Sequence, residues 1–131
     1  MKFVEKADIP TKQLPARVLQ NAVGVDASIP SSKMSVGFAR YSAESGPMEP
    51  HRHAEETVIV LESVSGRVRY GSAPDNLEHH VKLEKDMVLH FDELEWHVFE
   101  YEEGGEIEII FIYGQVDNIR PEQILDNVKK S

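Results

Sequence analysis

Short apolar segments separated by turn-forming residues fill the chain from Met34 onward, and this spacing strongly constrains the fold. Within MSVGFARYSA, alternation puts Val36 and Phe38 on one side of an extended strand and Ala39 and Tyr41 on the other. The segments TVIVL and IEIIFI are apolar on both sides, as strands are between a cavity and a packed second sheet. The pattern predicts an all-β sandwich or barrel, with strands at 34–43, 56–63, 66–72, 79–83, 86–91, 96–102 and 107–114.

The two ends of the chain differ in character from this central region. Residues 1–33 contain Pro10, Pro15 and Pro30, so we assign them to an N-terminal arm in which only ARVLQNAV, residues 16–23, is strand-like. Residues 34–115 form the predicted barrel. Residues 116–131 are expected to form a short C-terminal helix and tail, because Pro121 suits a first helical turn. The 131 residues fit one domain.

Composition narrows the classes of function. The formal charge of -9, from 14 basic and 23 acidic residues, opposes binding to nucleic acid or to an anionic membrane surface. The absence of cysteine leaves histidine and carboxylates as the strong metal ligands. The N-terminal MKFVEKADIPTK lacks the apolar core of a secretory signal, and no run approaches the ~20 apolar residues of a membrane span. We therefore expect a cytoplasmic protein.

Two histidines one residue apart begin the segment HRHAEETVIVL, directly before an apolar strand. Residues two apart in a strand point to the same face about 7 Å apart, so His51 and His53 can converge on one ion from one side. A further ligand from a neighbouring strand would be needed to close such a site. The nearby Glu55 and Glu56 are the candidate carboxylates. The competing interpretation is two solvated histidines on an exposed edge.

Two segments resemble the motifs of the cupin superfamily. GPMEPHRHAEETVIVLES is similar to the first cupin motif, and DMVLHFDELEWHVFE is similar to the second, through Asp86 and the Trp96-His97 dipeptide. The first motif has one residue fewer than the family pattern between Gly46 and His51. In the second, the family glycine near the turn is replaced by Glu93 or Leu94.

The resemblance implies a small single-domain cupin with a double-stranded β-helix, or jelly-roll, barrel. It implies that His51, His53, His97 and one glutamate bind one divalent transition metal. Alignment from the strand favours Glu56, with Glu55 as the alternative. Manganese or iron is the first expectation by family resemblance, and nickel or zinc is also compatible with nitrogen and oxygen donors.

The resemblance also implies a metalloenzyme that acts on a small polar or anionic metabolite, of the dioxygenase, decarboxylase, lyase or isomerase type. Glu56 would then be the catalytic residue, able to carry a proton. A non-catalytic binding or sensing cupin is the alternative, and a cupin with a purely structural ion is a second alternative. No binding to nucleic acid or membranes is expected.

Further residues are candidates for a substrate pocket and an interface. Arg40 can hold a carboxylate or phosphate by a forked contact, although an exposed strand position is the competing interpretation. Phe99 shares strand parity with His97, and it and Tyr113 are candidate cavity walls. His90 is expected to have a structural role near the barrel mouth or to face solvent. The edge strands of a small barrel have unpaired backbone N–H and C=O groups, and a second copy of the chain can cover them. We therefore expect a homodimer.

Overall fold

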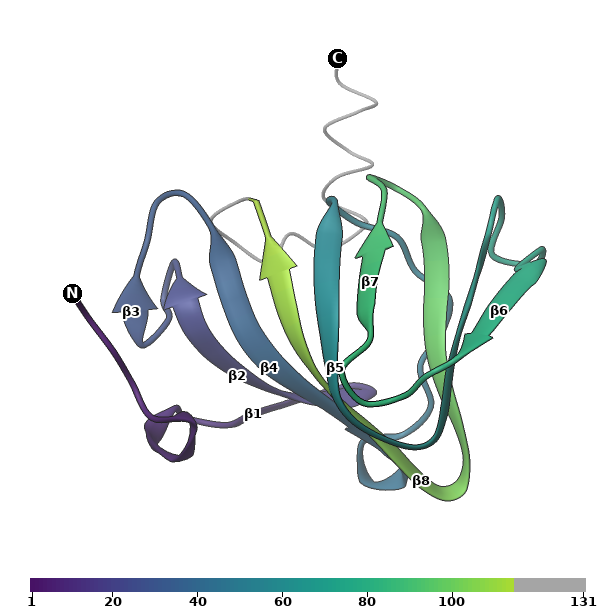
Figure 1. Ribbon diagram of the computed structural model, residues 1–131, viewed down its shortest axis with the longest axis horizontal. Helices are drawn as coiled ribbons and strands as arrows, with labels where there is room; N and C mark the ends of the chain where they lie inside the picture. The colour runs from purple at the N-terminus through teal and green to yellow at the C-terminus, as the bar shows by residue number, and fades with distance from the viewer. Residues whose placement is uncertain (115–131) are drawn as a thin grey trace.

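The computed structural model describes residues 1–114, so the predicted C-terminal helix at 116–131 lies outside the described residues (Figure 1). The described chain is almost entirely extended. Its elements are η1 Lys6–Asp8, β1 Lys12–Leu14, β2 Arg17–Gly24, β3 Ile29–Pro30, β4 Ser35–Ser42, η2 Ala43–Ser45, β5 Glu56–Gly71, β6 His79–Lys82, β7 Val88–Phe91 and β8 Trp96–Tyr113. Over this range no helix has the length and apolar character needed to cross a bilayer.

One curved sheet contains all eight strands, in the order β1-β2-β4-β8-β5-β6, with β3 beside β2 and β7 beside β5. All pairs are antiparallel except β2 with β3. Strands β5 and β8 pair along nearly their whole lengths, from Glu56 opposite Tyr113 to Gly71 opposite Trp96. Figure 1 shows that the sheet is strongly curved, with β2, β4 and the end of β8 on one side and β6 with the start of β8 on the other.

Long bent strands replace pairs of shorter predicted ones. The segments 56–63 and 66–72 form the single strand β5, and 96–102 and 107–114 belong to β8. The register between β5 and β8 shifts between Val64 and Gly66, where both strands turn the corner of the barrel. Gly104 has a φ of 80°, and a Cβ at Gly105 would collide with the Val64 carbonyl oxygen. Glycine at these two positions therefore lets β8 turn this corner while it stays paired with β5.

The prediction of an arm over residues 1–33 is wrong for Arg17–Gly24. These residues form β2, which pairs with β4, as in the Leu19 to Ala39 register. Leu19 is buried in the core, and this burial favours incorporation into the sheet. Pro10 and Pro15 precede the strand and so interrupt none of its hydrogen bonds.

The core lies on the inner face of the curved sheet. On β4, Ala39 and Tyr41 are buried on this face, while Arg40 is exposed on the other, as the sequence alternation predicts. The rings of Tyr41 and Phe99 stack with centroids 5.1 Å apart, joining β4 to β8. The core contains Leu19, Ala39, Tyr41, Val58, Val60, Val68, Leu83, Phe91, Phe99, Ile107, Ile109 and Phe111.

Candidate metal centre

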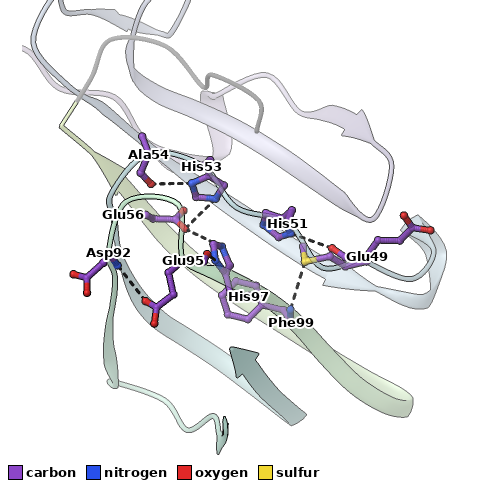
Figure 2. Close-up of polar contacts among 10 residues, drawn as sticks. Glu49, His51, His53, Ala54, Glu56, Asp92, Glu95, His97 and Phe99 are labelled. Atoms are coloured by element: carbon purple, nitrogen blue, oxygen red, sulfur yellow. Dashed lines mark hydrogen bonds and ion pairs between the residues drawn. The ribbon is translucent and has the colours of Figure 1, made fainter. Parts of the chain in front are cut away.

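Three histidines from two distant segments meet on the inner side of the barrel (Figure 2). His51 and His53 precede β5, whereas His97 is the second residue of β8. The backbones of His51 and His97 form a two-way bridge, with N···O distances of 3.0 and 2.9 Å. One ring nitrogen from each histidine lies within 4.8 Å of those of the other two. The geometry therefore brings together the three imidazoles that the sequence indicated.

The backbone fixes the orientation of all three rings. The Nδ1 atom of His51 donates to the Glu49 carbonyl at 3.1 Å, that of His53 to Ala54 at 2.9 Å, and that of His97 to Glu95 at 2.8 Å. Because a carbonyl oxygen can only accept, each Nδ1 carries the proton. Each Nε2 therefore presents a lone pair, the form in which imidazole binds a metal.

His97 gives the most direct test of whether a metal fits. Its side chain is 1% exposed, and its Nε2 has no hydrogen-bond partner within the described chain. A buried polar atom without a partner is unfavourable by about 1–3 kcal/mol. The Phe91 ring stacks on the imidazole at 4.0 Å and leaves Nε2 directed at the cluster. A coordinated cation would satisfy this atom, so the donor set fits a divalent metal.

The two adjacent glutamates have opposite environments. Glu56 is 4% exposed, and its Oε1 lies 3.5 Å from His53 Nε2 and 3.9 Å from His97 Nε2 (Figure 2). Ligands of one ion with bonds of ~2.0–2.2 Å lie roughly 3.0–3.5 Å apart, close to these separations. Glu55 is exposed and accepts a hydrogen bond from His90 Nε2 at 2.7 Å. Only Glu56 faces the histidines, and Glu55 points away from them.

Burial controls the protonation of these groups in the metal-free protein. Loss of hydration raises the pKa of Glu56 to about 8, although a hydrogen bond from Tyr113 and the charge of Arg17 oppose the shift. Burial also lowers the pKa of His53 to about 4 and holds the pKa of His97 well below its usual range. The His53 and His97 rings are therefore neutral at pH 7 and available as ligands.

A cavity of about 490 Å³ adjoins the cluster and is lined by His51, His53 and Glu56. This volume is typical of sites for small organic molecules. Phe99 and Tyr113 line the cavity, as the sequence indicated, and Tyr113 hydrogen bonds to Glu56. Further apolar walls come from Leu19, Ala39, Met48 and Phe111.

Arg40 does not line this cavity. It lies on the outer face of β4, where its Nη2 pairs with Glu106 Oε2 at 2.6 Å. The sequence analysis instead missed Arg17 and Tyr41, which do line the cavity. Arg17 is two residues before Leu19 and so shares its face of β2. This relation was not used because the segment was assigned to an arm. The signal for Tyr41 was its parity with Ala39.

The remaining histidines lie outside the site. His79 and His80 are exposed at the start of β6, within the strand predicted at 79–83. His90 is exposed on β7 and contacts Thr57 and Glu55, with its Nδ1 2.8 Å from the Thr57 hydroxyl. None of these three residues lines the cavity.

No family model matches the sequence. No curated protein matches it either. Solved structures match over most of the chain. A protein from Planctomyces limnophilus has a TM-score of 0.69 at 17% identity, covering 92% of this chain and 94% of its own. The polyketide cyclase RemF from Streptomyces resistomycificus has a TM-score of 0.67 at 16% identity, covering 97% and 93%.

A third match is the oxalate decarboxylase of Lactobacillus farciminis in its formate complex. Its TM-score is 0.65 at 13% identity, covering 92% of this chain and 36% of that one. Together with the antiparallel barrel and the three-histidine cluster, these matches define the class: the protein has the jelly-roll fold of the cupins.

Proposed function

We propose that this protein is a metal-dependent cupin enzyme that acts on a small polar or anionic organic molecule. His51, His53, His97 and Glu56 would hold one divalent transition metal. The observation that carries the proposal is the cluster of half-buried His51 with buried His53 and His97 beside a cavity of about 490 Å³. A metal that only stabilised the barrel would not need its ligands His51 and His53 to line a cavity of metabolite size.

Nitrogen and oxygen donors without sulfur suit manganese, iron, nickel or zinc, and we propose manganese or iron first. One fold neighbour, the enzyme HppE, has been solved with Fe(II) and an alternative substrate, at 12% identity and a TM-score of 0.64. A bound ion of this kind would act as a Lewis acid toward a substrate oxygen or, if redox-active, support oxygen chemistry.

The protein's own groups would orient the substrate and move a proton. Glu56 shares a hydrogen bond with Tyr113, and both line the cavity. We propose that the Glu56 carboxylate takes a proton from the substrate or returns one to it. The apolar walls, including Phe99 and Phe111, would limit the access of water to that carboxylate. Proton movement of this kind suits decarboxylase, lyase or isomerase chemistry, and a dioxygenase remains within the same proposal.

The neighbours support an enzyme by their own activities. They include the DMSP lyase DddQ of Ruegeria pomeroyi, at 11% identity and a TM-score of 0.67, besides the decarboxylase and the cyclase. We also propose a homodimer, because β1 and β6 are edge strands of the sheet formed by residues 1–114. Sedimentation velocity at several protein concentrations would test the dimer, and a species of one chain throughout would refute it.

The test combines metal content with turnover. We expect the purified protein to contain close to one transition metal per chain, and His97→Ala to lose it, whereas His80→Ala on the exposed part of β6 retains it. The loaded protein would then be screened by NMR for consumption of small carboxylic acids. Loss of consumption in His97→Ala but not in His80→Ala would support an enzyme. A metal-free native protein, or equal consumption by both variants, would refute the proposal.

A further inference from the structure

Arg17 is the one positively charged side chain among the described residues that line the cavity. It lies at the start of β2, on the same face as Leu19, and is half-buried. Its Nη1 donates to the Pro15 carbonyl oxygen at 3.0 Å. Within residues 1–114 no carboxylate lies within salt-bridge distance of its guanidinium. A guanidinium has five N–H donors, so most of this fork is available to a ligand.

The turn that carries Arg17 is held in place by several contacts. Ala16, the residue before it, has a φ of 73° and donates from its backbone N–H to the Ser45 carbonyl at 2.8 Å. The Gln13 side chain donates to the Arg17 carbonyl at 3.2 Å and to the Ser45 hydroxyl at 3.0 Å. A left-handed conformation at a residue other than glycine persists only where the surroundings enforce it. Arg17 is therefore presented to the cavity from a fixed backbone.

The charges of the cavity favour an anion despite the acidic net charge of the whole chain. Its carboxylates are Glu56, which faces the histidines, and Glu49, whose side chain is exposed and extends away from them in Figure 2. With a divalent metal bound, the metal and Arg17 together outweigh these two negative charges. A single unpaired guanidinium matches one carboxylate, because its fork forms two parallel hydrogen bonds to the two oxygens. A phosphate dianion would require further cationic groups, and no other lysine or arginine lines the described cavity.

We propose that Arg17 binds the carboxylate of the substrate. The substrate is then a small monocarboxylic acid, and a second oxygen-containing group of this acid is directed at the histidine cluster. This inference rests on the proposed function and adds the class of substrate to it. The part of the acid between the two polar ends packs against Leu19, Phe99 and Phe111. Arg17 is thus a specificity-determining residue on the wall of the cavity.

The test compares acids with their amides, which have nearly the same shape but no charge. The probes are glycolate and glycolamide, lactate and lactamide, and mandelate and mandelamide, measured by calorimetry with the metal-loaded protein. We expect at least one acid to bind about tenfold or more tightly than its amide, because charge-assisted hydrogen bonds are lost in the amide. We expect Arg17→Gln to remove this preference and leave metal content unchanged, and Arg17→Lys to restore part of the preference.

Arg40→Gln is the matched control, since it removes the same charge from the outer face of β4 and should leave the preference intact. The same titrations of the metal-free protein separate Arg17 from the ion, because an acid preference due to Arg17 persists there. Four results would overturn the inference. Acid and amide could bind equally well, or none of the three acids could bind at millimolar concentration. Phosphoglycolate could bind more tightly than the acids, or Arg17→Gln could retain the preference. A protein without bound metal whose acid preference depends on Arg17 would instead refute only the proposed function.

Discussion

The guanidinium of Arg52 lies over the ring of Trp96, 4.7 Å from its centroid. Arg52 stands between His51 and His53, and Trp96 directly precedes His97, so this contact joins the two segments that supply the histidines. The Arg52 Nε atom is buried without a hydrogen-bond partner in the described chain, which leaves the aromatic face as its main contact there. The pair supports the backbone bridge between His51 and His97.

Replacing Trp96 should therefore loosen the histidine cluster. A cation–π contact contributes about 0.5–2 kcal/mol, so we expect Trp96→Leu to weaken metal binding by roughly two- to thirtyfold in competition with a chromogenic chelator. Arg52→Gln should weaken it by a similar amount, and the double variant by no more than either single change. Additive losses would show that the two residues act independently of their contact.

Glu56 and Glu55 provide a matched pair for the carboxylate ligand. Glu56→Gln should lower metal affinity by about tenfold or more, because it removes a charged donor facing His53 and His97. Glu55→Gln should change metal affinity less than twofold, since Glu55 bonds to His90 on the exposed side. Calorimetric titration with Mn²⁺ would measure both. The reverse ranking would refute Glu56 as the ligand.

Stability of the metal-free protein should fall between pH 6.5 and pH 8. Folding raises the pKa of Glu56 from 4.5 to about 8, so its contribution is fully present below pH 4.5 and is lost as the pH rises through 8. Folding lowers the pKa of His53 from 6.5 to about 4, so its contribution is present above pH 6.5 and is lost as the pH falls through 4. Between pH 4.5 and 6.5 the two effects oppose each other, and above pH 6.5 the Glu56 effect remains.

Urea unfolding at several pH values would measure this dependence. The free energy of unfolding should decrease by at most about 1.4 kcal/mol per pH unit over the window. Glu56→Gln has no titrating carboxyl at this position and should show little change from pH 6.5 to 8. A wild-type protein whose stability is constant or rises in this range would contradict the assignment.

Phe99 forms part of two cavities. It lines the cavity beside the histidines and a second one of about 450 Å³ that also contacts Tyr101 and Met48. Phe99→Ala should destabilise the fold by about 3–5 kcal/mol, because the side chain is 2% exposed and stacks on Tyr41. Phe38→Ala, on the other face of the sheet, should destabilise by less than about 2 kcal/mol. Equal losses in thermal unfolding would contradict this placement of Phe99.

The sequence predicted the strand regions and the histidine cluster for local reasons. Alternation in β4 depends only on the two-residue repeat of a strand, and it correctly separated Ala39 and Tyr41 from Val36 and Phe38. The two-residue spacing of His51 and His53 predicted a common direction, although in the structure they lie in the irregular segment before β5, and His97 was expected from the resemblance to the second cupin motif. The alternation also left Arg40 with two interpretations, of which the structure supports the exposed one.

Other features depend on long-range pairing and could not be predicted in this way. Residues 16–23 were expected to be strand-like, but the pairing of β2 with β4 is a long-range contact, and it sets the position of Arg17. The choice between Glu93 and Leu94 at the turn glycine depended on one backbone angle: Leu94 has a φ of 63°, and its N–H donates to the His53 carbonyl at 2.8 Å. Leu94 therefore adopts a left-handed backbone conformation, which glycine adopts freely, and a hydrogen bond to a distant part of the chain is formed there.

The anchoring of all three imidazoles by main-chain carbonyls has an evolutionary consequence. Each of these Nδ1 atoms contacts a main-chain oxygen, and exchange of the side chains at Glu49, Ala54 and Glu95 does not remove that oxygen. The cavity walls Leu19 and Arg17 come from β2, which carries none of the three histidines, and can vary separately. Such a barrel can acquire a new substrate specificity through a few substitutions in the cavity wall. The orientation of its three imidazoles is kept as long as the backbone conformation is kept.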